Sequence, residues 1–363
     1  MSAPRQYPDV FHKHRWTVLP EPVQRAVYEI GCASRRDQVD PGQIDTYRQG
    51  LANLTPAAVP RGGYEIRRLY KPDEPWVRPV DEIPNQAPPW YRIGPGGGGS
   101  GDRHRLTRYP DLGWLFLFHG DGYLRQAALE ALPGPPRSPF EFAAICYRLN
   151  DWVENVRLAA EAYAARAFPE TDPSVIAGAA LFLLEMEPHL QRWSDRGQGL
   201  MRHALARPDV AASLAQILET ALTGRQGFLL QQLLRDPPLD TSLHRLAHHA
   251  AHPGVRRVAM TALLTGEARW LTGHRFEWTD KTMGLRKRIP THDTRSLTVA
   301  RDLPALLSAA AHDRSPKVRE VAADGLIAHR EKATSHMDAL AAHLAEDTSP
   351  SVRSRAAFYL NRR

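Results

Sequence analysis

The chain has 363 residues, 47 Lys and Arg side chains against 40 Asp and Glu, and only two cysteines. Two cysteines support neither a disulfide framework nor a cysteine-based metal cluster, and the length allows two ordinary domains or one repeat array with an appendage. The longest apolar run, residues 175–186, is too short to span a bilayer, and the first residues lack the apolar core of a signal peptide. These features predict a cytoplasmic protein with no membrane segment.

The first 58 residues are predicted to form an N-terminal helical cap. Residues 22–34 and 41–54 each place apolar side chains on one side of a helix. A repeat array needs such a cap, because its first unit has an apolar face without a neighbour.

Residues 59–110 are predicted to be an extended Pro/Gly-rich arm and linker. Nine prolines fall between positions 60 and 110 and should prevent long helices, and residues 64–70 could form a short strand. Aromatic anchors are expected at Trp76, Trp90 and Tyr91. The glycine-rich stretch 94–101 is interpreted as a flexible linker, because it lacks the Gly-Lys-Ser/Thr ending of a phosphate loop.

Residues 111–363 repeat one pattern of helix initiation. Asp313-Arg-Ser-Pro-Lys-Val-Arg319 is followed by Asp347-Thr-Ser-Pro-Ser-Val-Arg353, and apolar positions follow each copy at helical spacing. A fainter copy runs from Asp151 to Arg157, and related arginines occur at 125 and 256. Their spacing fits a period of 31 to 34 residues, which is typical of helical repeats. Five helix pairs are predicted within 111–268, and two more at 303–329 and 335–361.

These motifs resemble the HEAT-repeat family, in particular its short bacterial form, the PBS-lyase-like HEAT repeats. The resemblance covers residues 111–363 and implies an all-α fold: an α-α superhelix, or HEAT-like solenoid, of about seven right-handed helix pairs with negligible strand content. It also implies a structural ladder in which each arginine pairs with the aspartate six residues before it. The pairs would be Asp151 with Arg157, Asp313 with Arg319, and Asp347 with Arg353.

The segment 269–301 interrupts this period and is predicted to be either a degenerate unit or an insertion. It carries eight Lys or Arg and three Asp or Glu residues. Aromatic and basic side chains of this kind serve both nucleic-acid surfaces and protein hot spots. We therefore predict the partner-binding site here, with these residues: Trp270, Arg275, Phe276, Trp278, Lys281, Arg286, Lys287 and Arg288.

The predicted function is that of a non-enzymatic scaffold or adaptor, which binds another protein through its repeat surface. The basic charge of the C-terminal third suggests an acidic partner. A nucleic-acid-binding protein is the alternative, and a DNA glycosylase resembling the alkylpurine glycosylases is a third, suggested by Asp151-Trp152 near Arg157. No catalytic residue, metal site or cofactor is predicted. Histidines at 244, 248, 249 and 252 are interpreted as solvated residues at a helix end.

Overall fold

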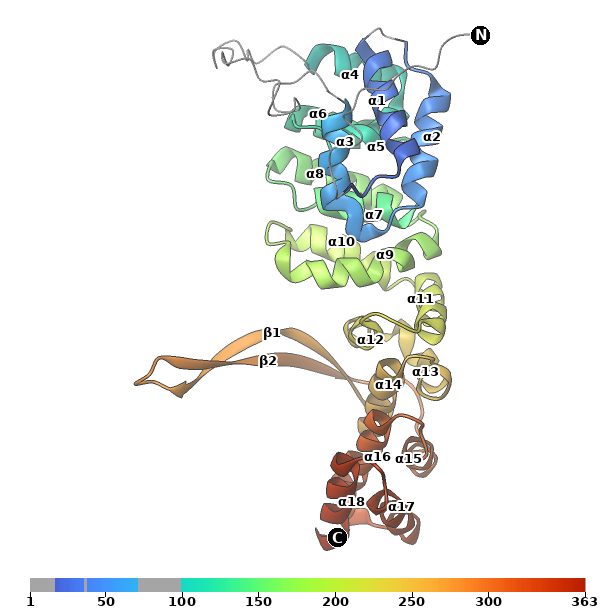
Figure 1. The fold of residues 1–363 in the computed structure, drawn as a ribbon, viewed down its shortest axis with the longest axis vertical. Coiled ribbons are helices and arrows are strands. Elements are labelled where there is room, and N and C mark those ends of the chain that lie inside the picture. The colour runs from blue at the N-terminus through green and yellow to red at the C-terminus, as the bar shows by residue number, and fades with distance from the viewer. Residues whose placement is uncertain (1–16, 36–37, 71–98, 363) are drawn as a thin grey trace. The chain divides into compact units, whose positions relative to one another are not determined.

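The computed structural model describes residues 17–35, 38–70 and 99–362 (Figure 1). These ranges are mostly helical, with eighteen α-helices and one two-stranded antiparallel sheet. The chain divides into two compact units, Met1–Ala204 and Leu205–Arg363. The sheet contradicts the expectation of negligible strand content in 111–363.

The first unit contains ten α-helices among its described residues, interrupted by short 3-10 turns. They are α1 Glu21–Arg35, α2 Pro41–Ala52, α3 Val59–Tyr70, α4 Gly99–Arg108, α5 Gly113–Phe116, α6 Gly122–Ala131, α7 Pro139–Arg148, α8 Glu154–Ala167, α9 Pro173–Met186 and α10 Asp195–Leu205. Its core combines aliphatic side chains with four fully buried aromatic ones, Trp114, Phe116, Phe140 and Phe142.

The prediction of an extended arm at 59–110 is wrong for the two parts that the structure describes, α3 and α4. Pro60 lies in the first turn of α3, where a proline removes no intrahelical hydrogen bond. Val59, Ile66 and Leu69 are buried at helical spacing, and α3 packs against α1 and α7. The proposed strand at 64–70 is therefore helical, and the predicted glycine linker overlaps the start of α4 at Gly99. Trp76, Trp90 and Tyr91 lie outside the described residues.

The second unit holds eight helices and both strands. The helices are α11 Pro208–Thr220, α12 Gln226–Leu233, α13 Leu243–His249, α14 Pro253–Thr265, α15 Leu303–Ala311, α16 Pro316–Ala328, α17 Ser335–Ala345 and α18 Pro350–Arg362; the strands are β1 Glu267–Asp280 and β2 Leu285–Ser296. Helix α14 packs on α16 and α16 on α18, while α15 packs on α17. The helices predicted to begin at Pro316 and Pro350 do so, with Val318, Ala322 and Leu326 completely buried in α16.

The ladder exists, but the predicted pairing within one repeat is wrong. Arg319 donates from Nη2 to the Asp347 carboxylate at 2.9 Å, and Arg256 from Nε to that of Asp313 at 2.8 Å. The aspartate six residues before Arg319 instead contributes its backbone carbonyl, because its carboxylate accepts the amide of Ser315 and the guanidinium of Arg256.

Two other predicted pairs follow the same rule. Arg157 and Arg353 bind the backbone oxygens of Asp151 and Asp347, the residues with which an ion pair was predicted. Arg256 likewise binds the backbone oxygen of Ala250, so an alanine at that position suffices. A backbone carbonyl is available from any residue type, whereas the carboxylate must come from the following helix pair.

The segment between α14 and α15 is an insertion that forms a β-hairpin. Arg256 and Asp313 are 57 residues apart, whereas Arg319 and Asp347 are 28 apart, so the same contact is made across the inserted residues. The prediction of either a degenerate unit or an insertion is resolved in favour of the insertion.

Arg295 fastens the base of the hairpin to the helices. Its guanidinium donates to both carboxylate oxygens of Asp240, at 2.7 and 2.9 Å, and also to the backbone oxygens of Leu234 and Asp236. Asp240 is completely buried. Burial alone would raise the pKa of this carboxyl, but the hydrogen bonds from Arg295 and Thr298 lower it below its ordinary value.

We expect Arg295→Ala to lower the free energy of unfolding of the second unit by about 1–3 kcal/mol, since the buried Asp240 carboxylate would lose its counter-charge. Hydrogen exchange of α12 and α13 in the full-length chain would measure it. Arg275→Ala is the control, because its pair with Glu277 is exposed and should contribute less than about 1 kcal/mol. Equal protection in both variants would contradict the anchoring role.

Candidate functional site

The hairpin is a two-stranded ribbon whose distal part is exposed along its whole length. Strand β1 packs on α12 and α14 near its start, where Ala268 is buried. Residues 274–288 are all exposed and project away from the helices of their own unit (Figure 1). At the turn, the Asp280 carboxylate accepts the amides of Thr282 and Met283, and Gly284 takes a positive φ of 67°. The turn therefore closes with local bonds, without support from the helices.

One face of the distal ribbon combines arginines with aromatic rings. The register pairs Phe276 with Arg288 and Trp278 with Arg286, and alternate residues of a strand share a face. The Arg286 guanidinium lies 5.0 Å from the Phe276 ring centroid and 5.3 Å from that of Trp278. We call this set the arginine–aromatic face; its members are His274, Phe276, Trp278, Arg286 and Arg288.

The two rings of this face are open to solvent. Phe276 is 60% and Trp278 53% exposed, and stacked arginines leave their in-plane N–H groups free to donate. Nearer the base, His292 lies on the same side; its pKa is lowered by burial and by the charges of Arg269 and His274. Arg286 and Arg288 supply two permanent positive charges on the face.

The opposite face of the ribbon is electrostatically mixed. Arg275 pairs with Glu277 at 2.7 Å, and Glu277 stands directly across from Lys287. The arginine–aromatic face contains no carboxylate among its five members. The two faces of the ribbon thus differ in their charge: one carries arginines without carboxylates, and the other carries both signs.

The eight residues predicted for the partner site therefore separate in space. Phe276, Trp278, Arg286 and Arg288 come together, whereas Arg275 and Lys287 lie behind them and Lys281 lies in the turn. Trp270 is half-buried near the base, with a buried Nε1 that has no hydrogen-bond partner among the described residues. Four residues were missed: His274 on the face, and the exposed Met283 and Leu285 with Gly284 at the turn. The alternation of Phe276 and Trp278 with polar residues was the signal for a strand.

The features that suggested a glycosylase do not form an open carboxylate site. Asp151 accepts four hydrogen bonds: two from Arg125, at 2.8 and 2.9 Å, one from Arg148 at 2.7 Å and one from the amide of Val153. Burial raises the pKa of this carboxyl, but the Arg125 hydrogen bonds and the Arg148 charge outweigh it, so the pKa is lowered. A carboxylate held in this way has no free oxygen lone pair directed at a substrate.

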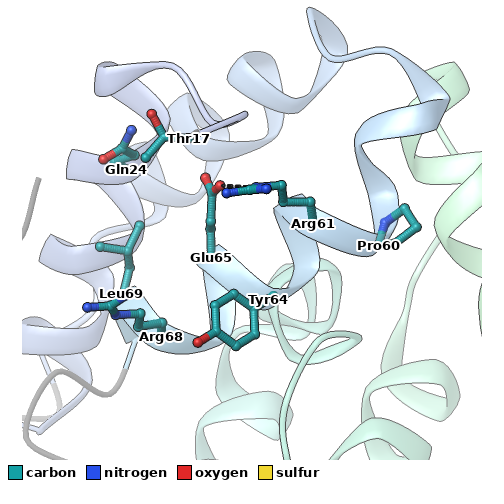
Figure 2. A pocket seen from close by; sticks show the side chains of 8 residues that line it. All are labelled: Thr17, Gln24, Pro60, Arg61, Tyr64, Glu65, Arg68 and Leu69. Carbon is teal, nitrogen blue, oxygen red and sulfur yellow. Dashed lines mark ion pairs between the residues drawn. The ribbon is translucent and has the colours of Figure 1, made fainter. Parts of the chain in front are cut away.

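A cavity of about 610 Å³ lies beside α1 and α3 (Figure 2). Glu65, the one carboxylate among the described residues of its wall, pairs with Arg61 at 3.6 Å and accepts the backbone amides of Val18 and Leu19. Glu65 therefore ties the chain before α1 to α3. The wall extends from Thr17 to Leu69, at the edges of the described ranges, so the described residues do not define a closed site.

The histidines near α13 have structural partners. His252 accepts the amide of Gly254 as the N-cap of α14, and His244 lies 2.9 Å from the backbone oxygen of Ala300. The described residues contain no group of three or more His, Cys, Asp or Glu side chains arranged to hold a metal ion. In the same ranges, no helix combines the length and apolar character needed to cross a bilayer.

Comparison of the chain with models of protein families, with characterised proteins and with solved structures finds no significant match.

Proposed function

We propose that this chain is a non-enzymatic binding protein whose hairpin contacts nucleic acid through the arginine–aromatic face. The main support is that Phe276 and Trp278 are exposed and stack with Arg286 on a ribbon that extends from the helices. Exposed rings stack on bases and guanidiniums bind phosphates, and a two-stranded ribbon is narrow enough for the major groove of B-form DNA.

The helices of the second unit would then act as the scaffold that holds the hairpin. Two observations support a HEAT-like superhelix. Alternate helices between α14 and α18 pack on one another, and the ion pairs Arg256–Asp313 and Arg319–Asp347 repeat from one helix pair to the next. In such an array each helix pair is supported by its neighbours. A hairpin inserted between two helix pairs is anchored at its base by the helices, whereas its turn stays exposed.

A protein partner is the second candidate, favoured by the exposed Met283 and Leu285 at the tip, which are 72% and 56% exposed. Apolar and aromatic side chains next to arginine are typical of protein hot spots. We rank nucleic acid first, because Arg286 and Arg288 have no carboxylate on their own face, so both charges are available to a polyanion. The saturated Asp151 carboxylate gives the glycosylase alternative no support.

The test compares two double variants that remove the same charge from opposite faces. We expect Arg286→Ala with Arg288→Ala to weaken binding of a 20-bp DNA duplex by tenfold or more, about 1.4 kcal/mol or more. The slope of log affinity against log salt should fall in magnitude by about 2. Arg275→Ala with Lys287→Ala is the matched control and should weaken binding about threefold or less. Fluorescence anisotropy over a salt series would measure both.

Equal losses in the two double variants would mean that net charge alone determines binding and that the face has no special role. Wild-type affinity in both would exclude the hairpin as the nucleic-acid interface. If the wild-type chain binds neither duplex nor single-stranded DNA at about 150 mM salt, the ranking reverses in favour of a protein partner.

A further inference from the structure

A second cluster of arginines lies in the first unit, around Asp151. The carboxylate is bound by two guanidiniums, Arg125 and Arg148, and all three side chains are largely shielded from solvent. Two guanidinium cations share one carboxylate, so one positive charge has no counter-charge among the described residues at a site shielded from solvent. Burial lowers the pKa of Arg148 to about 10, against the attraction of the Asp151 carboxylate.

The ladder itself does not require the additional arginine. At the equivalent aspartates, Asp313 and Asp347, a single ladder arginine binds each carboxylate. The residue three positions earlier, equivalent to Arg148, is Ala310 in one and Leu344 in the other, and both are fully buried. Arg148 is thus a local addition, and its Nε is buried without a hydrogen-bond partner among the described residues.

These groups border a pocket of about 370 Å³ that has further cations. Arg67 and Arg192 join Arg125 and Arg148 in its wall. Among the described residues of the wall, the one carboxylate is Asp151, which already accepts four hydrogen bonds. The guanidiniums of Arg67 and Arg192 have no carboxylate partner within the described part of the chain, and both residues are exposed. A pocket with this excess of positive charge favours an anion over a cation or a neutral ligand.

Two exposed aromatic residues complete the pocket. Trp152 is 73% and Tyr64 55% exposed, and both belong to its wall. At the position of Trp152, the two C-terminal repeats have Arg314 and Thr348, so the ring is no part of the repeat pattern. A ring beside arginines suits a ligand that joins an oxyanion to a planar group.

We infer that this pocket binds the phosphate of a nucleoside phosphate, with the base placed near Trp152. Guanidinium groups match the oxygen geometry of phosphate through paired N–H donors. The same chemistry is offered by a free nucleotide and by the end of a nucleic-acid strand. The inference is independent of the hairpin, whose arginine–aromatic face belongs to the other unit.

The test uses isothermal titration of the full-length chain at constant ionic strength, with inorganic phosphate, adenosine, AMP and a 5′-phosphorylated single-stranded hexanucleotide as probes. We expect saturable binding of AMP, weaker binding of phosphate and none of adenosine. Arg67→Ala with Arg192→Ala should weaken AMP at least tenfold. Trp152→Ala should weaken AMP at least threefold while leaving phosphate unchanged. Arg103→Ala removes an exposed arginine of the same unit, outside the pocket wall, and should change nothing.

The hexanucleotide distinguishes the two sources. In the variant with Arg286→Ala and Arg288→Ala, which removes the hairpin's contribution, affinity at least tenfold tighter than that of AMP identifies a strand end as the ligand, and equal affinity identifies a free nucleotide. No saturable binding of AMP, phosphate or the hexanucleotide overturns the inference, as does wild-type affinity in the Arg67→Ala, Arg192→Ala variant. Arg286→Ala with Arg288→Ala should leave AMP binding unchanged, so failure at the hairpin and failure at this pocket give different results.

Discussion

Replacing Asp151 with alanine is expected to lower the free energy of unfolding of the first unit by about 3–5 kcal/mol. The side chain of Asp151 is 1% exposed, and the variant would leave the guanidiniums of Arg125 and Arg148 facing each other without a counter-charge. It would also remove the acceptor for the amide of Val153 ahead of α8. Urea denaturation followed by far-UV circular dichroism would measure the change.

A second substitution shows whether the buried arginine charges cause the destabilisation by Asp151→Ala. Adding Arg148→Met to Asp151→Ala should recover about 1–2 kcal/mol, because one of the two uncompensated cations is removed. Glu21→Ala is the surface control; its ion pair with Arg25 is exposed and should matter by less than about 1 kcal/mol. No recovery in the double variant would show that lost packing, rather than charge, explains the destabilisation.

The same aspartate should contribute to acid sensitivity. Its pKa is lower in the folded chain than in an unfolded one, so its ion pairs stabilise the fold fully above about pH 4. That stabilisation is lost as the pH falls through the lowered folded-state pKa. The Asp151→Ala variant should therefore lose stability less steeply than the wild type on acidification below about pH 4.

Trimming the hairpin is expected to abolish duplex binding while preserving the helical fold. The variant replaces residues 272–291 by Asn-Gly, which joins Leu271 to its cross-strand partner His292 through a two-residue turn. It removes five Lys and Arg side chains and the exposed aromatic rings, and binding should weaken at least about 100-fold, or about 2.8 kcal/mol. Anisotropy with the same 20-bp duplex would measure it.

The helices should tolerate this trimming because the anchoring contacts remain. Ala268 and Arg295 lie below the cut, and Arg256 still reaches Asp313 to join α14 to the following helix pair. The melting temperature of the trimmed chain should stay within about 3 °C of the wild type. Undiminished binding with its full salt dependence would remove the hairpin from the proposed function, and a collapse of helix content would contradict the insertion argument.

Much of the helical architecture could be predicted from the residues, because helix initiation is local. Asp302, Ser315 and Ser349 stand immediately ahead of helices, and a proline in the first turn of α16 and α18 costs no hydrogen bond. The apolar spacing after each start then selects the buried face. Proline misled the interpretation around residue 60, where its place in the first turn of α3 was not recognised.

The candidate hairpin site was only partly predictable, because proximity along the chain does not specify a face. The sequence by itself identified the basic and aromatic composition of 269–301. Pairing register then put Arg286 and Arg288 with Phe276 and Trp278, and put Lys287 behind them. A shift of one residue would exchange these faces, and register depends on the turn at 281–284 and on both strands together.

The tertiary structure alone decided the partners of the buried charges. The spacing from Asp313 to Arg319 is six residues, yet the carboxylate that Arg319 binds is 28 residues further on. Arg148 likewise gave no sign in the sequence that it shares a carboxylate with Arg125, 26 residues before that aspartate. Helix starts follow from neighbours within a turn of chain, whereas an ion pair between helices depends on how their faces pack, and packing joins residues that are distant in sequence.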